Sequence, residues 1–188
     1  MKSAFCYIAE IVRPEVVVDL VIDSLATRGV TINHPTLGQV TQINREGVGV
    51  ETNLQEISRR LRDDAEVTTQ FWFNSDTNVI VSFRQLSENN IRHIYSLDGL
   101  DARERELMRG WAVDYFRPKI STHLATLLVV DPEGVTSDVD WDVVVDREQV
   151  PGLRFPPAIL GIKSPLADQL HSKRLTERVD VGDFALLF

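Results

Sequence analysis

The sequence cannot form an internal disulfide, because Cys6 is the only cysteine among its 188 residues. Disulfides are features of oxidising compartments, so a chain without them is typical of a reducing one and we expect a cytoplasmic protein. Long apolar runs are also missing. None approaches the roughly 20 residues that a membrane helix requires, and the start of the chain lacks the cleavage pattern of a secretory signal. We therefore expect no membrane partner.

The chain has fewer basic than acidic residues. The chain has 20 lysines and arginines against 28 aspartates and glutamates, a formal net charge of -8. Such a chain repels phosphate backbones, so we expect no nucleic-acid partner, whereas a basic protein would be attracted to it. The remaining composition, 43% hydrophobic and 26% charged, is that of a globular domain with a packed core.

Linear signatures of catalysis and cofactor binding are absent. The segment REGVGVET contains G-x-G, but Thr52 occupies the position of the third glycine and no βαβ series follows. No P-loop, G-x-S-x-G or H-E-x-x-H motif occurs. Four histidines match no zinc spacing: His34, His93, His123 and His171. The sequence therefore predicts no cofactor and no metal, and Cys6, between apolar neighbours, is interpreted as a small buried residue.

Alternating apolar and polar residues dominate the middle of the chain. Three runs, at 66–74, 78–86 and 90–97, are separated by turn residues and predict an antiparallel meander. In the first run Val67, Thr69 and Phe71 share one face, and Trp72 lies on the other. Further strands are expected at five places, namely residues 3–12, two within 37–51, 123–131, 158–162 and the end of the chain from Arg178.

Helical spacing and capping residues predict four helices. The first begins at Pro14 and ends before Gly29, and the second is capped by Thr52 with Gln55. The third begins at Asp101 with Glu104 and ends at Pro118, and a short fourth is expected at 165–172. Residues 1–188 are thus predicted to form a single α+β domain. Its fold is a mainly antiparallel, twisted sheet, a meander, covered by two or three helices.

The stretch SDVDWDVVVDRE (137–148) has the densest group of potentially chemical side chains. Its period of two predicts a hairpin strand with Trp141 and valines on the inner face. Four aspartates would then face outward: Asp138, Asp140, Asp142 and Asp146. An EF-hand loop is excluded because its glycine and glutamate positions are Val143 and Gln149. A solvated face, a docking face for a basic partner, and a magnesium shared with Asp131 stay open.

A protein-binding or neutralising domain without enzymatic activity is the function that these features favour. A bacterial immunity protein or an antitoxin that captures a basic partner is one concrete form. Its contacts would be the four aspartates Asp138, Asp140, Asp142 and Asp146, with Trp72 of the meander. Acidic patches steer the association of basic proteins, and aromatic side chains supply affinity.

An enzyme with a dispersed acid site is a second hypothesis, in which Asp138, Asp140, Asp142 and His93 act as acid and base. A histidine on a strand face with Ile91 and Tyr95 is, however, typical of a packed and hydrogen-bonded side chain.

A structural or assembly subunit of a phage or secretion particle is a third hypothesis. Its contacts would lie in the proline-rich loop at 151–165, at Leu153 or Phe155.

Overall fold

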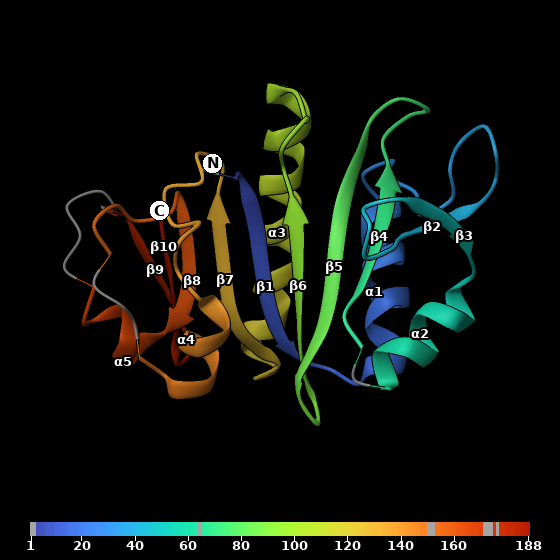
Figure 1. Cartoon of the computed structure of the whole chain (residues 1–188). Helices are drawn as coiled ribbons and strands as arrows, with labels where there is room; N and C mark the ends of the chain where they lie inside the picture. Colours follow the sequence, from blue (N-terminus) through green and yellow to red (C-terminus); the bar gives the residue numbers. More distant parts are fainter. Residues whose placement is uncertain (1–2, 64, 150–152, 171–174, 176) are drawn as a thin grey trace.

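One antiparallel sheet runs through the whole molecule (Figure 1). The computed structural model describes residues 3–63, 65–149, 153–170, 175 and 177–188. Within these residues ten strands pair in the order β3-β2-β4-β5-β6-β1-β7-β8-β10-β9. In chain order they are β1 (Phe5–Ile11), β2 (Val40–Ile43), β3 (Gly49–Thr52), β4 (Val67–Trp72), β5 (Asn78–Ser87), β6 (Asn90–Ser96), β7 (Ala125–Asp131), β8 (Ile159–Lys163), β9 (Arg178–Val181) and β10 (Phe184–Leu187).

The predicted meander is confirmed as β4, β5 and β6, joined by short turns with Phe71 opposite Val79 and Phe83 opposite His93. The amino-terminal strand β1 pairs beside β6, with Ile8 opposite His93, and β7 continues the sheet on its other side. The predicted α+β class with a twisted antiparallel sheet is therefore confirmed.

Helices pack on both faces of the sheet (Figure 1). The larger core lies on the face that we call the α3 face, under α1 (Pro14–Ala26), α2 (Leu54–Arg62) and α3 (Ala102–Ser121). A smaller core lies on the opposite face, the α4 face, under α4 (Trp141–Arg147) and α5 (Ser164–Ala167). The central strands β1 and β7 are buried on both faces, which explains the nearly continuous apolar sequence of β7.

The ends of the helices follow the capping residues, with two corrections. Helix α3 begins with the predicted capping box of Asp101 and Glu104, but Pro118 lies inside it rather than ending it. The helix continues because Ile120, only 1% exposed, is anchored in the core, and the hydroxyl of Ser121 donates to the Pro118 carbonyl. The cap of α2 is Asn53, whose side chain accepts from the Glu56 N–H at 2.9 Å, and not Thr52.

The carboxyl-terminal elements agree with the prediction in part. Residues 158–162 contribute to β8, and the chain end forms the hairpin of β9 and β10 rather than a single strand. The short helix expected at 165–172 is limited to α5, and its last residues, 171 and 172, lie outside the described residues.

Two glycines test how closely α3 approaches the sheet. A Cβ added at Gly161 in β8 would lie 2.9 Å from the Phe116 ring of α3 and 2.9 Å from Leu186, whereas a Cβ at Gly110 within α3 would meet nothing within 4 Å. We expect Gly161→Ala to destabilise the protein by about 1–3 kcal/mol through overpacking. Gly110→Ala should stabilise it by up to about 1 kcal/mol through helix propensity. Urea denaturation measures both, and equal effects would contradict the close contact.

Candidate functional site

The aspartate-rich stretch does not form the predicted strand. Residues 132–138 make consecutive turns, and α4 follows from Trp141 to Arg147, with the Asp140 side chain accepting from the Val143 N–H at 3.4 Å. Trp141 and Val144, three residues apart, are the buried residues of this helix. The aspartates recur at every second residue, which predicted a strand, but Trp141 and Val144 are also spaced as on one face of a helix. Asp140, a good capping residue, is the feature of the sequence that favours the helix.

One part of the expected geometry is still observed. Trp141 is buried at 4% exposure, whereas Asp138, Asp140 and Asp146 are exposed. Asp142 differs from these three because it is half-buried and paired. The four aspartates therefore do not share one environment.

Asp131, considered as a partner in a magnesium site, has a structural role. Its carboxylate is fully buried and accepts from the backbone N–H groups of Val135 and Thr136 and from the Thr136 hydroxyl at 2.7 Å. These bonds stabilise the turn that leads into α4. Among the described residues, no group of three or more His, Cys, Asp or Glu side chains is arranged to hold a metal ion.

A pocket of about 290 Å³ lies between the start of α4 and the α4 face of β1 and β6. We call it the Tyr7 pocket. Its polar side chains include Ser3, Tyr7, Arg92, Ser96, Asp140 and Asp142. Its apolar walls are Phe5, Ile94, Val139 and the Trp141 ring. These residues come from three separate parts of the sequence, residues 3–7, 92–96 and 137–142, so no linear motif could reveal the pocket.

Asp142 is the residue that connects α4 to the sheet in this pocket. The Tyr7 hydroxyl donates to Asp142 Oδ1 at 3.0 Å, and Arg92 Nη1 and Arg84 Nη1 lie 3.6 Å and 3.9 Å from Asp142 Oδ2. Arg92 also donates to Glu66 at 2.8 Å. Burial and the neighbouring Asp142 raise the pKa of Tyr7, so its hydroxyl stays a hydrogen-bond donor.

Two buried donors among the residues of the Tyr7 pocket lack acceptors. Arg92 Nε and Trp141 Nε1 have no hydrogen-bond partner among the described residues. A buried N–H without an acceptor costs about 1–3 kcal/mol, and native structures contain few of them. Three other buried polar atoms without a partner among the described residues belong to Trp72, Asn90 and Arg105, outside this pocket, whereas Arg92 and Trp141 both line the Tyr7 pocket.

Trp72 lies apart from the aspartates. It ends β4, is 9% exposed, and its ring packs against that of His34 with 4.3 Å between the centroids. Strands β5 and β6 separate β4 from β1 in the sheet. The structure thus does not bring Trp72 and the aspartates into one site.

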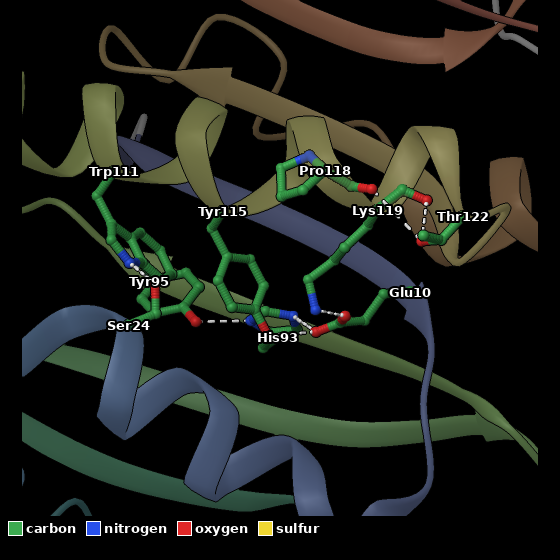
Figure 2. Close-up of polar contacts among 9 residues, drawn as sticks. All are labelled: Glu10, Ser24, His93, Tyr95, Trp111, Tyr115, Pro118, Lys119 and Thr122. Atoms are coloured by element: carbon green, nitrogen blue, oxygen red, sulfur yellow. Dashed lines mark hydrogen bonds and ion pairs between the residues drawn. The ribbon is translucent and has the colours of Figure 1, made fainter. Parts of the chain in front are cut away.

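A second polar cluster is buried on the α3 face (Figure 2). Glu10 Oε1 accepts from the Tyr115 hydroxyl at 2.7 Å and from His93 Nε2 at 2.9 Å, and Glu10 Oε2 is paired with Lys119. The Tyr95 hydroxyl lies 2.6 Å from His93 Nδ1. Because a carboxylate only accepts, His93 Nε2 donates to Glu10, and the Tyr95 hydroxyl is the partner of Nδ1, so both ring nitrogens have a hydrogen-bond partner.

Glu10 is charged in spite of its burial. Desolvation, the largest single effect, raises its pKa, but hydrogen bonds and charge from His93 and Lys119 together outweigh it and lower the pKa from 4.5 to about 2. His93 is fully buried and packed as expected, on the face opposite to that of Arg92 and Asp142. The structure therefore does not bring together the residues of the dispersed acid site.

The two remaining candidates from the sequence are Cys6 and the proline-rich loop. Cys6 is fully buried, and burial raises the pKa of its thiol to about 12, which suppresses thiolate chemistry. In the proline-rich loop, Leu153 packs against the smaller core and the Arg154 guanidinium lies 5.4 Å from the centre of the Phe155 ring. Residues 151 and 152 of this loop lie outside the described residues.

No family model, curated protein or solved structure matches the chain in the comparisons with known proteins. Across the described residues, none of the helices has both the length and the apolar character needed to span a bilayer. The site is therefore interpreted from its own geometry.

The buried Glu10 cluster predicts a specific dependence of stability on pH. Its carboxyl pKa is about 2 in the folded protein and near 4.5 when unfolded, so the stabilisation is complete above about pH 4.5 and is lost as the pH falls toward 2. We expect Glu10→Gln to cost about 3–5 kcal/mol at pH 7, because it leaves the Lys119 charge without its partner. Its penalty relative to the native protein should shrink as the pH falls through this window.

Urea denaturation at pH 7 and pH 3 measures this effect, with Glu88→Gln as the matched control because Glu88 is exposed and its side chain has no partner among the described residues. The free energy of unfolding of Glu88→Gln should equal that of the native protein at both pH 7 and pH 3. A Glu10→Gln penalty that does not change with pH would contradict the assignment.

The position of Asp140 provides a test of helix α4. Asp140→Ala should destabilise the protein by about 0.5–2 kcal/mol, because it removes the side chain that caps the helix. Asp138→Ala should change the stability little, since Asp138 is exposed in a turn without a partner among the described residues. Thermal denaturation of both variants makes the comparison, and equal effects would argue against the cap.

Proposed function

We propose that this protein is a binding domain that captures a basic protein partner through the α4 side of its sheet. The observation that carries the proposal is the pair of exposed carboxylates Asp138 and Asp146, which have no partner among the described residues. Asp138 precedes α4 and Asp146 lies in its last turn, and α4 packs on the α4 face of the sheet. An immunity protein or antitoxin that neutralises a basic toxin is the form that we favour. A cytoplasmic location belongs to the same proposal.

The same face of the sheet is uncovered on β4, on β5 and on the part of β6 outside the Tyr7 pocket. On these strands alternate residues such as Phe71, Val81 and Tyr95 are buried in the larger core, and the residues between them are mostly half-buried or exposed. Ile80, at 41% exposure, is the most apolar exposed residue of this face. Figure 1 shows that no described helix covers it. A broad, mixed polar surface of this kind resembles a non-obligate protein interface in its composition.

The charges of this surface favour a basic partner. Arg84 and Arg92 are balanced by Asp142 and Glu66 in ion pairs, so they do not offset the free acids. Around α4 the exposed carboxylates exceed the exposed cations, and the whole chain is at -8. Complementary charge increases the rate at which a basic protein associates and makes that rate depend on salt.

The proposal is tested with two charge-matched variants. Asp138→Asn/Asp146→Asn removes the free acids before α4 and in its last turn, and Asp19→Asn/Asp23→Asn removes two exposed acids of α1, on the other side of the sheet. Asp140 and Asp142 are left unchanged because they cap and anchor α4. Each protein, and the native one, serves as bait in an extract of the source organism, followed by mass spectrometry.

We expect a stoichiometric basic partner that associates about three- to tenfold more slowly with Asp138→Asn/Asp146→Asn, with a weaker salt dependence. The rate should be unchanged for Asp19→Asn/Asp23→Asn. Biolayer interferometry with the purified partner measures the rates. Equal rates for both variants, or the lack of a basic partner, would refute the proposal.

A further inference from the structure

The Tyr7 pocket has features that a protein partner does not explain. Its volume of about 290 Å³ lies at the small end of ligand pockets. It lies between α4 and strands β1 and β6, and neither Asp138 nor Asp146 lines it. A pocket of this size accommodates a small molecule.

The buried donors identify one group of that molecule. Arg92 uses Nη1 toward Asp142 and Nη2 toward Glu66, which leaves only Nε without an acceptor. The Trp141 indole, 4% exposed, has no acceptor for its Nε1 either. A carboxylate has two oxygens and accepts strongly from both guanidinium and indole N–H groups. Its two oxygens match the two donors in number and in polarity.

Asp140, which lines the same pocket and directly precedes Trp141 in the chain, has the complementary chemistry. Asp140 is exposed and uses Oδ1 for a long hydrogen bond of 3.4 Å to the Val143 N–H, so its second oxygen has no partner among the described residues. An ammonium group is the natural partner for such a carboxylate. Asp142, in contrast, is already bound to Tyr7 and close to two arginines.

The pocket also has apolar walls that could contact a side chain on the same carbon as these two charged groups. Phe5, Ile94, Val139 and the rings of Tyr7 and Trp141 line the same pocket. We infer that the Tyr7 pocket binds a free amino acid with an apolar or aromatic side chain, with its carboxylate at Arg92 and Trp141 and its ammonium at Asp140. This inference does not depend on the proposed protein partner, because it involves neither Asp138 nor Asp146.

Isothermal titration calorimetry with each of the standard amino acids tests the inference on the native protein. We expect saturable binding of at least one apolar or aromatic amino acid. Two analogues of the amino acid that binds best test the two polar contacts separately. The amine that lacks the carboxylate and the acid that lacks the amino group should each bind at least about tenfold more weakly than the amino acid. No saturable binding of any amino acid, or equal binding of either analogue, would overturn the inference.

Two tryptophan variants locate the site. Trp141→Phe keeps an aromatic ring in the core but removes the indole donor, so it should weaken binding about tenfold. Trp72→Phe is the matched control, because Trp72 Nε1 is also buried without an acceptor among the described residues but lies outside the pocket. Unchanged affinity in Trp141→Phe, or an equal loss in Trp72→Phe, would place the ligand elsewhere.

Asp140→Asn completes the test, because asparagine caps a helix as well as aspartate but lacks the charge. It should weaken binding of the amino acid and leave binding of the deaminated acid unchanged. If Trp141→Phe does not fold, as judged by circular dichroism, the analogues and Asp140→Asn still decide between the outcomes. An equal effect of Asp140→Asn on both ligands would refute the ammonium contact.

Discussion

The pleat of strand β1 is the constraint on which both polar sites depend. Successive side chains of a strand point to opposite faces, so Ile8 and Glu10 enter the α3 face and Tyr7 enters the α4 face. Because β1 lies in the interior of the sheet with helices on both sides, each polar residue that it contributes must find its partners inside the protein. Glu10 and Tyr7 meet this requirement in different ways.

Glu10 finds all of its partners, and the result is a closed cluster. His93 comes from β6, and Tyr115 and Lys119 come from α3, so three elements must be in register for the carboxylate to be satisfied. A misaligned β1 would leave a charge buried without partners, which costs several kcal/mol. The cluster therefore favours the native alignment of β1 with β6 and α3 over a shifted one. With Glu10 and His93 fully buried, it offers no access for a substrate.

The sequence predicted those elements whose residues interact with near neighbours. The meander, the capping box of Asp101 and the proline at the start of α1 depend on spacings of a few residues, and all are confirmed. Helix α4 was missed because its aspartates alternate as on a strand, although Trp141 and Val144 are also one helical turn apart. The Tyr7 pocket could not be predicted, since Tyr7 and Asp142 are 135 residues apart in the chain. Only the fold brings them into contact.

Arg92 and Asp142 link the pocket to the uncovered face of the sheet. Asp142 accepts from Tyr7 inside the pocket and lies near Arg84, which is exposed on that face, while Arg92 extends from the pocket to Glu66. A ligand oxygen at Arg92 Nε would compete with neither ion pair but would fix the position of the guanidinium that makes both. A protein that contacts Arg84 or Glu66 would then stabilise or disturb the same position of the Arg92 guanidinium. Binding free energies at linked sites are reciprocal, so a small ligand and a protein partner would each change the affinity of the other by the same factor.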